Sequence, residues 1–194
     1  NEEADMNKLC DILEKFKHNI EEYQNYIKFI PLFVYFKKEY KHLINDKNFI
    51  ALKNKDLNTA EGYPDQETLE TLPKIIANIE ASNGPTGFES WVIIKKSDMK
   101  IIGDVGFKGI PNQAGEIDLG YGIIASERRN GYALEASEAL VKWGFSQSEV
   151  KKITAKCLIA NEGSVKILEK LNFKRSTTDA QFHFFILEKP QTLK

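Results

Sequence analysis

The sequence predicts an α/β fold built around a mixed, mostly antiparallel sheet, and two observations carry this prediction. Three segments with alternating apolar and polar residues follow one another at residues 89–95, 100–107 and 116–124, joined by short links. After them come an amphipathic helical pattern at residues 131–145 and another strand pattern at 153–159. A strand, a helix and a strand in this order form a right-handed crossover, so the strands that begin at Glu116 and Ile153 are expected to be parallel neighbours. The length of 194 residues fits one domain.

The N-terminal part of the chain predicts an amphipathic helix ahead of this sheet. Apolar residues recur there at intervals of three and four: Met6, Leu9, Leu13, Phe16, Ile20, Tyr23 and Ile27. We expect residues 1–24 to form a helical extension that either docks on the chain's own body or makes a homodimer. The segment from Tyr26 to Ile30 could equally be a first strand, and Pro31 ends whichever element it forms.

Two further helical regions are predicted before the first of the three strands. The stretch from Val34 to Ile44 has the pattern of a short helix. Pro64 opens a second helical region that Asp65 can cap and that Pro73 kinks or restarts.

The strand at residues 116–124 has two unlike faces. Its apolar face consists of Ile117, Leu119, Tyr121 and Ile123, and its other face consists of Glu116, Asp118, Gly120 and Gly122. Two carboxylates followed by two glycines leave room for a group to approach the backbone closely. After the crossover, the sequence predicts a helix at residues 161–171 and closing strands at 174–178 and 181–187.

The loop between that strand and the following helix has the features of a phosphate site. It contains Arg128, Arg129, Asn130 and Gly131, followed by Tyr132 and Ala133 at the helix start. Unpaired N–H groups at a helix N-terminus attract anions, and arginine adds planar, permanently charged donors. Only three of the 27 basic residues are arginines, and two of these three fall in this loop. The loop matches neither the phosphate loop of NTPases nor the three-glycine dinucleotide fingerprint.

The motif Arg128-x-x-Gly131-x-Ala133 resembles the [Gln/Arg]-x-x-Gly-x-[Gly/Ala] loop of the GCN5-related N-acetyltransferases, the GNAT family. Two more segments resemble the same family, namely Leu119-Gly120-Tyr121-Gly122-Ile123 and the block that runs from Asn161 and Ser164 to Phe173. The resemblance is closest to the branch of ribosomal-protein N-terminal alanine and serine acetyltransferases. It implies a GNAT domain at residues 25–190, with a sheet of six to seven strands splayed between two central parallel strands and with helices on both faces.

What the resemblance implies is acetyl transfer from acetyl-CoA to a primary amine, either a protein N-terminus or a small-molecule amine. Backbone amides of the loop would hold the pyrophosphate, and the pantetheine arm would pair with strand backbone between the two parallel strands. Asn161 would contact this arm and Ser164 would lie near the sulfur, although Asn161 can also serve as a helix cap. The residues implied for acetyl-CoA are Ile123, Ile124, Arg128, Arg129, Asn130, Gly131, Tyr132, Ala133, Asn161 and Ser164.

The catalytic assignments by resemblance are Asp118 as base and Glu116 as second candidate. Ser164 or water would protonate the thiolate, unless the thiol leaves as thiolate. An ordinary aspartate, with a pKa near 3.9, is a poor base at neutral pH, so this role requires burial or a carboxylate neighbour. The alternative is that Asp118 orients the incoming cation without taking its proton. Lys156 and Leu168 stand where some relatives carry a catalytic Glu and a Tyr acid, which keeps open a catalytically silent acyl-CoA-binding module.

Composition excludes several other classes of protein. The net charge of -1 argues against a nucleic-acid partner, and two cysteines are too few for a disulfide framework or a Cys-based zinc site. The three histidines show no metal-ligand spacing, so no metal is expected. The longest apolar stretch, residues 29–36, is far shorter than a membrane span, and the start is acidic. We therefore expect a cytoplasmic protein whose alternative function is interaction through the N-terminal helix.

Overall fold

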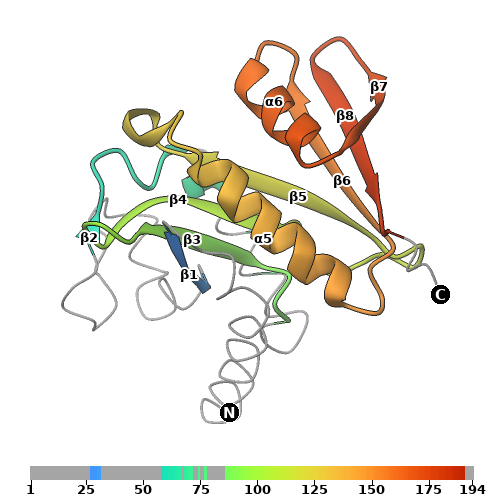
Figure 1. Ribbon diagram of the computed structural model, residues 1–194, viewed down its shortest axis with the longest axis horizontal. Helices are drawn as coiled ribbons and strands as arrows, with labels where there is room; N and C mark the ends of the chain where they lie inside the picture. The colour runs from blue at the N-terminus through green and yellow to red at the C-terminus, as the bar shows by residue number, and fades with distance from the viewer. Residues whose placement is uncertain are drawn as a thin grey trace.

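The computed structural model describes residues 27–31, 58–66, 68–71, 74, 77 and 86–190 (Figure 1). The predicted helices at residues 1–24 and 34–44 and the kink at Pro73 lie outside these residues. Within them, each strand and helix predicted after residue 86 is present, and its ends differ from the prediction by one residue at most.

A single mixed sheet organises the chain. The strands follow the spatial order β1-β3-β4-β5-β6-β8-β7, and the two-residue β2 pairs with β4. Their bounds are Ile27–Pro31 for β1, Asn58–Thr59 for β2, Ser90–Lys95 for β3, Lys100–Phe107 for β4, Glu116–Ile123 for β5, Lys152–Leu158 for β6, Lys174–Thr178 for β7 and Phe182–Glu188 for β8. Neighbours along this order are antiparallel except β5 and β6, which are parallel as predicted, and the short β2 is parallel to β4. The segment ending at Pro31 is a strand, β1, so the strand alternative is confirmed there.

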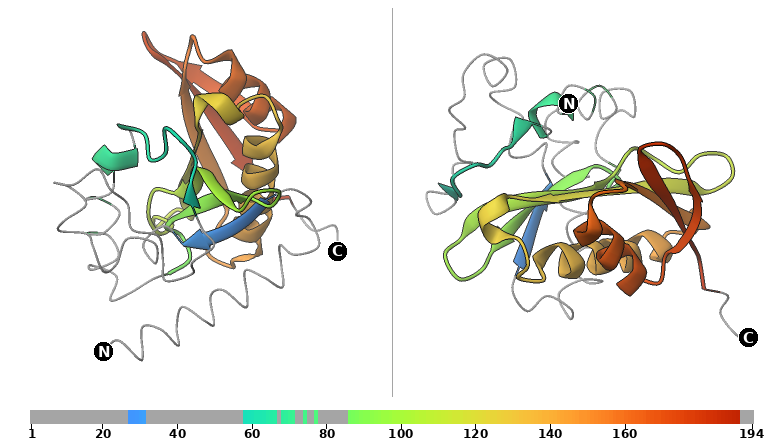
Figure 2. Two further views of the ribbon diagram at one scale, coloured as in Figure 1. Left: turned by 90° about the vertical axis from the view of Figure 1, so that its left-hand side faces the viewer. Right: turned by 90° about the horizontal axis from the view of Figure 1, so that it is seen from above.

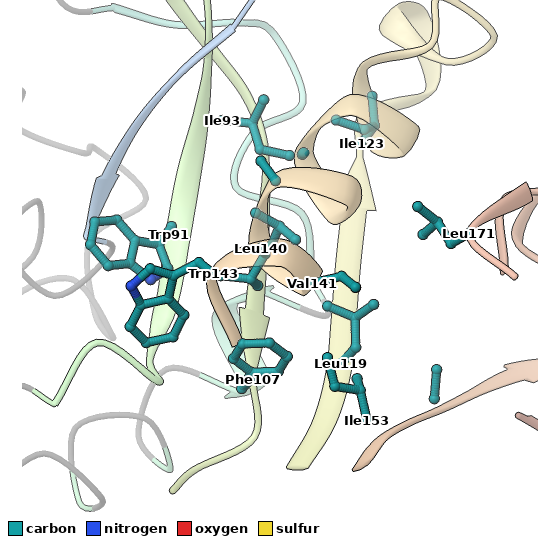
Figure 3. Packing of buried hydrophobic residues seen from close by; sticks show 14 of the residues in the cluster. Trp91, Ile93, Phe107, Leu119, Ile123, Leu140, Val141, Trp143, Ile153 and Leu171 are labelled. Carbon is teal, nitrogen blue, oxygen red and sulfur yellow. The ribbon is translucent and has the colours of Figure 1, made fainter. Parts of the chain in front are cut away.

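Helix α5 (Tyr132–Ser146) covers one face of the sheet and forms the core with it (Figure 3). Its predicted apolar residues Ala136, Leu140 and Trp143 are each at most 3% exposed. Gly144 lets the helix approach closely, because a Cβ there would lie 2.9 Å from the ring of Phe107. This packing fixes α5 across β4 and β5, so the start of the helix stands beside the end of β5.

Asp65, Thr68 and Thr71 lie on the other face of the sheet, where they line a pocket together with Gly120 and Gly122 (Figure 2). Asp65 caps the helical residues that follow it as predicted, because its Oδ1 accepts from the backbone N–H of Thr68 at 2.9 Å. Helical structure therefore lies on both faces of the sheet.

The C-terminal part contains α6 (Glu162–Lys170) and the hairpin of β7 and β8. Asn161 caps α6, because its Oδ1 accepts from the backbone N–H of Ser164 at 3.1 Å. The helix-cap role considered for Asn161 is thus confirmed.

Candidate active site

The central feature of the sheet is a gap between its two parallel strands. Pairing of β5 with β6 runs from Glu116 opposite Lys152 to Leu119 opposite Ala155 and stops there. Both strands continue, β5 to Ile123 and β6 to Leu158, and Figure 1 shows them diverging. The splayed sheet that the family resemblance implied is therefore present.

Backbone groups of β5 point into this gap at alternate residues. Residues 118 and 124 face β4, because Lys108 N–H donates to the Asp118 carbonyl and Ile124 N–H donates to the Ile102 carbonyl. By the alternation of a β-strand, the polar groups of Tyr121 and Ile123 face the gap. The carbonyl of Ile124 accepts from Glu127 N–H, so both of its backbone groups are bonded within the chain, and its pairing with a pantetheine arm stays a prediction.

The loop after β5 turns its backbone N–H groups outward at the start of α5. A short 3-10 turn, η2 (Ala125–Glu127), precedes it, and Arg129 and Gly131 both have left-handed backbone, with φ of 65° and 87°. In the described chain, none of the backbone N–H groups of residues 129–133 donates to another group. A Cβ on Gly131 would meet nothing within 4 Å, so the space over the loop is open. These groups fit the pyrophosphate expected there.

Arg128 contacts the end of β5, and its binding of acetyl-CoA stays a prediction. Its Nε donates to the carbonyl of Ile123 at 2.9 Å, so the side chain turns back to the end of β5. The bond ties the loop to the edge of the gap and occupies the Ile123 carbonyl. Arg128 therefore holds the loop in place, and Arg129 is the arginine whose side chain has no bond in the described chain.

Tyr121 bridges the gap, a role that sequence analysis missed. Its hydroxyl donates to the carbonyl of Ser164 in α6 at 3.3 Å. Burial raises the pKa of Tyr121 to about 12. Burial also raises the pKa of the Cys157 thiol, which lies on the diverging end of β6. The Gly120-Tyr121-Gly122 pattern was the available signal, since a lone aromatic between two glycines stands out in a strand.

A pocket of about 550 Å³ lies over the glycine-bearing face of β5. Gly106, Gly120 and Gly122 line it together with Asp104, Asp65 and Thr68. A Cβ on Gly122 would meet nothing within 4 Å, so the predicted room above these glycines exists. Thr68 Oγ1 lies 2.9 Å from Asp65 Oδ1 and 3.0 Å from Asp104 Oδ2, which brings two carboxylates to one hydroxyl. Sequence analysis did not find Asp104, because nothing in the sequence indicated that it lies opposite Gly122.

The two candidate bases are both paired with lysines. Asp118 Oδ2 lies 2.6 Å from Lys108 Nζ, and its Oδ1 accepts from Thr154 Oγ1 at 3.2 Å. The Asp118 side chain is 33% exposed, so neither burial nor a carboxylate neighbour, the two conditions set for a base, is met. Glu116 Oε1 lies 2.6 Å from Lys152 Nζ, and this bond holds the pKa of Glu116 below its ordinary value. Both carboxylates thus already bind a cation of the chain.

The other assigned positions lie around the gap. Ser164 is in the first turn of α6, where its backbone carbonyl faces Tyr121, and the role of its hydroxyl stays a prediction. Lys156 lies over the ring of Phe182 at 4.8 Å, and Leu168, 1% exposed in the core, has no ionisable group. Within the part of the chain that the structure describes, no group of three or more His, Cys, Asp or Glu could hold a metal ion. In that same part, no helix is long and apolar enough to cross a membrane.

A splayed pair of parallel strands beside an open helix N-terminus is the arrangement of an acyl-CoA-dependent transferase. Residues 42–174, more than half of the chain, match the family model described as acetyltransferase (GNAT) domain. The chain belongs to the GNAT family and is an N-acetyltransferase of the EC 2.3.1 type.

Known proteins of this family resemble the chain in sequence and in structure. The uncharacterized N-acetyltransferase YjdG of Bacillus subtilis is 37% identical over 136 residues, which cover 70% of this chain and 81% of that protein. A ribosomal-protein-S5-alanine acetyltransferase from Vibrio fischeri aligns with a TM-score of 0.55 at 16% identity, over 86% of this chain and 94% of that chain. RimL, a ribosomal L7/L12 alpha-N-protein acetyltransferase in complex with coenzyme A, aligns with a TM-score of 0.59 at 12% identity, over 86% and 96%. At these identities the structural likeness shows the fold.

Proposed function

We propose that this N-acetyltransferase transfers an acetyl group from acetyl-CoA to a primary amine by direct attack of the amine on the thioester. The observation that carries the proposal is the continuity of two spaces along β5. Pairing with β6 stops before Gly120, where the gap opens, and Gly120, Tyr121 and Gly122 of the same strand line the pocket. A donor held in the gap and an acceptor held in the pocket would therefore meet at these glycines.

The donor side is supported by groups that are otherwise unpaired. The N–H groups of residues 129–133 would hold the pyrophosphate with Arg129, and the gap-facing backbone of Tyr121 and the N–H of Ile123 would bind the pantetheine arm. Acetyl-CoA supplies an activated acetyl group whose leaving group is a thiolate. Because it lies in the first turn of α6, Ser164 remains our candidate for donating a proton to that thiolate.

The acceptor side is supported by the charges of the pocket. Asp104 and Asp65 line the pocket and offer carboxylates to a positively charged amine, and Asp118 is paired with Lys108, which lines the pocket as well. An α-amino group, with a pKa near 8, is roughly 10% neutral at pH 7, whereas a lysine amine is neutral to well under 0.1%. Neither Asp118 nor Glu116, the two candidate bases, meets the conditions set for a strong base, so we infer a peptide N-terminus or a small-molecule amine of similar basicity as acceptor.

A second candidate function is an acyl-CoA-binding module without turnover. The observation that favours it is the pairing of Asp118 with Lys108 and of Glu116 with Lys152, each at 2.6 Å. Both carboxylates are occupied by cations of the chain itself, and Leu168 is an apolar core residue.

One assay separates the two functions. Release of free CoA from acetyl-CoA is followed with a thiol reagent over a panel of small amines and N-terminal peptides, and acetyl-CoA affinity is measured by calorimetry. The proposal expects saturable turnover of at least one acceptor. Binding of acetyl-CoA without turnover on the whole panel would favour the silent module.

The variant Gly131→Glu tests the loop in the same assay. The glutamate places bulk and negative charge beside the expected pyrophosphate, so acetyl-CoA binding should be lost. Gly62→Glu is the matched control, because Gly62 also has a positive φ, 89°, and open space for a Cβ. Both variants carry a backbone strain of about 1–2 kcal/mol, so only the difference between them reports on binding. Undiminished binding in Gly131→Glu would contradict the loop assignment.

A further inference from the structure

Lys108 forms a cross-strand ion pair at the edge of the acceptor pocket. It follows β4 directly and lies opposite Asp118, to whose carbonyl its backbone N–H donates at 2.9 Å. Its Nζ lies 2.6 Å from Asp118 Oδ2, and its side chain is 46% exposed. A second anchor fixes the carboxylate, because Asp118 Oδ1 accepts from Thr154 Oγ1 of β6. The amine of Lys108 is thus held in place by a residue that is itself held from two strands.

The side chain of Lys108 lies over the bare part of β5. A Cβ on Gly120 would meet a single side-chain neighbour, the Cε of Lys108, at 3.5 Å. Lys108, Gly120 and Gly122 all line the pocket of about 550 Å³. Gly120 is also the first residue of β5 beyond the last pair with β6, where the gap opens. A primary amine of the chain itself therefore occupies the place at which donor and acceptor are expected to meet.

We propose, resting on the proposed function, that Lys108 is a self-acetylation site at which the enzyme transfers an acetyl group from acetyl-CoA to its own Nζ. The ammonium of Lys108 first gives one proton to water while Asp118 holds the nitrogen in place. The neutral nitrogen then attacks the thioester carbon, and a C–N bond forms as the C–S bond breaks. The new amide nitrogen loses a second proton, so that of the two protons one passes to the departing thiolate and one to water. The products are acetyl-Lys108, CoA and a proton, with no change in oxidation state.

Self-acetylation changes the charge of the pocket. Acetyl-Lys108 carries no positive charge, so the ion pair to Asp118 is lost. Asp118 is then left with its Thr154 contact and can receive the ammonium of an external acceptor. One modification per molecule is sufficient for this change, so the reaction at Lys108 needs no fast turnover. Until it is acetylated, the ammonium of Lys108 therefore occupies the position beside Asp118 that an external acceptor would take.

The test is site-resolved acetylation of the full chain incubated with acetyl-CoA and no added acceptor. Peptide mass spectrometry compares Lys108 with two matched lysines in ion pairs away from the gap. Lys142 pairs with Glu138 on α5 at 3.0 Å and is 42% exposed, and Lys152 pairs with Glu116 at 2.6 Å where β5 and β6 are still paired. Lys108 should be acetylated about tenfold or more faster than both, as expected when an amine is held beside the donor. The rate per molecule should not change on dilution of the protein.

Variants and a binding measurement decide between the outcomes. Asp118→Asn should slow the acetylation of Lys108 and leave the acetylation rates of Lys142 and Lys152 unchanged. Gly131→Glu should reduce the acetylation rate of Lys108 to that of these two control lysines. Equal acetylation of the three lysines, or turnover of an external amine with Lys108 unmodified, would overturn the self-acetylation and leave the proposed function standing. Failure of the wild-type chain to bind acetyl-CoA by calorimetry would overturn both.

Discussion

Asp118 and Glu116 lie on the same face of β5, and each is bonded to a lysine. The two candidate bases differ in their positions along the strand. Asp118 lies two residues before Gly120, at the edge of the pocket, whereas Glu116 lies where β5 and β6 are firmly paired. Asp118→Asn should lower turnover by about tenfold or more, because it removes a carboxylate that can hold a cation two residues before Gly120. Glu116→Gln is the control, and acetyl-CoA affinity should change little in either variant.

The shape of the pH profile separates the two roles considered for Asp118. If Asp118 is a base, the plot of turnover against pH should differ between the variant and the wild-type chain in its acidic limb. A residue that only orients a cation would raise KM for the amine and leave the profile as in the wild type. A wild-type profile in Asp118→Asn would therefore remove Asp118 as base.

Tyr121 gives the folded state a pH dependence at the alkaline end. Its pKa of about 12 lies above the ordinary 10.0 because the hydroxyl is buried. Above pH 10 the unfolded chain loses this proton while the folded chain retains it, so the free energy of unfolding falls between pH 10 and 12. This loss is about 1–3 kcal/mol. Denaturant unfolding of the wild type and Tyr121→Phe at pH 8 and pH 11.5 measures it, because the titration of the lysines cancels in the difference.

The two results expected of Tyr121→Phe have opposite signs. At pH 8 the variant should be less stable than the wild type by about 1 kcal/mol, since the bond to the Ser164 carbonyl is lost. At pH 11.5 the difference in the free energy of unfolding should have shifted in favour of the variant, because only the wild type loses stability through Tyr121. A constant difference at both pH values would show that the hydroxyl is not buried in solution.

At the scale of elements, β5 could be predicted well and its surroundings could not. Its period of two, its two glycines and the crossover to β6 are local or nearly local features, so the sequence indicates them. The gap itself follows from where pairing with β6 stops, after Leu119 and Ala155, and only the family resemblance pointed to it. Lys108 and Asp104 lie in or beside β4 and reach the site through strand register, which the sequence does not reveal. The bond of Arg128 to the Ile123 carbonyl was missed because it depends on side-chain direction.

The glycine-bearing face of β5 provides a prediction about the pocket as a whole. Gly122→Leu should be tolerated by the fold, because a Cβ there meets nothing within 4 Å. Its side chain would project into the pocket and raise KM for the amine by about tenfold or more, as filling a binding pocket by a few methylene groups does. Acetyl-CoA affinity should stay within about twofold, and Gly122→Ala should fall between the wild type and the leucine variant. An unchanged KM in Gly122→Leu would exclude this pocket as the acceptor site.

Most of the described strands and helices form two groups joined along the start of β5. One group contains β1, β3, β4, β5 and α5, and the other contains β6, α6, β7 and β8. Four residue pairs between β5 and β6 connect the two sheet halves, and the bond from Tyr121 to Ser164 adds a contact across the gap. A donor bound along the gap would contact both groups, so its binding energy should stabilise the molecule as a unit.

Acetyl-CoA should therefore raise the Tm of the full chain and protect both edges of the gap together. At a concentration of about 100 Kd, binding adds about 2.7 kcal/mol, which corresponds to a Tm increase of about 5–10 °C for a chain of this size. Amide exchange at residues 121–123 and 156–158 should slow in parallel. ADP, which offers a pyrophosphate without the pantetheine arm, should protect the loop at residues 129–133 and leave residues 156–158 unchanged. Equal protection of residues 156–158 by ADP and acetyl-CoA would show that the gap does not hold the arm, because ligand at the loop alone would then be enough to couple the two groups.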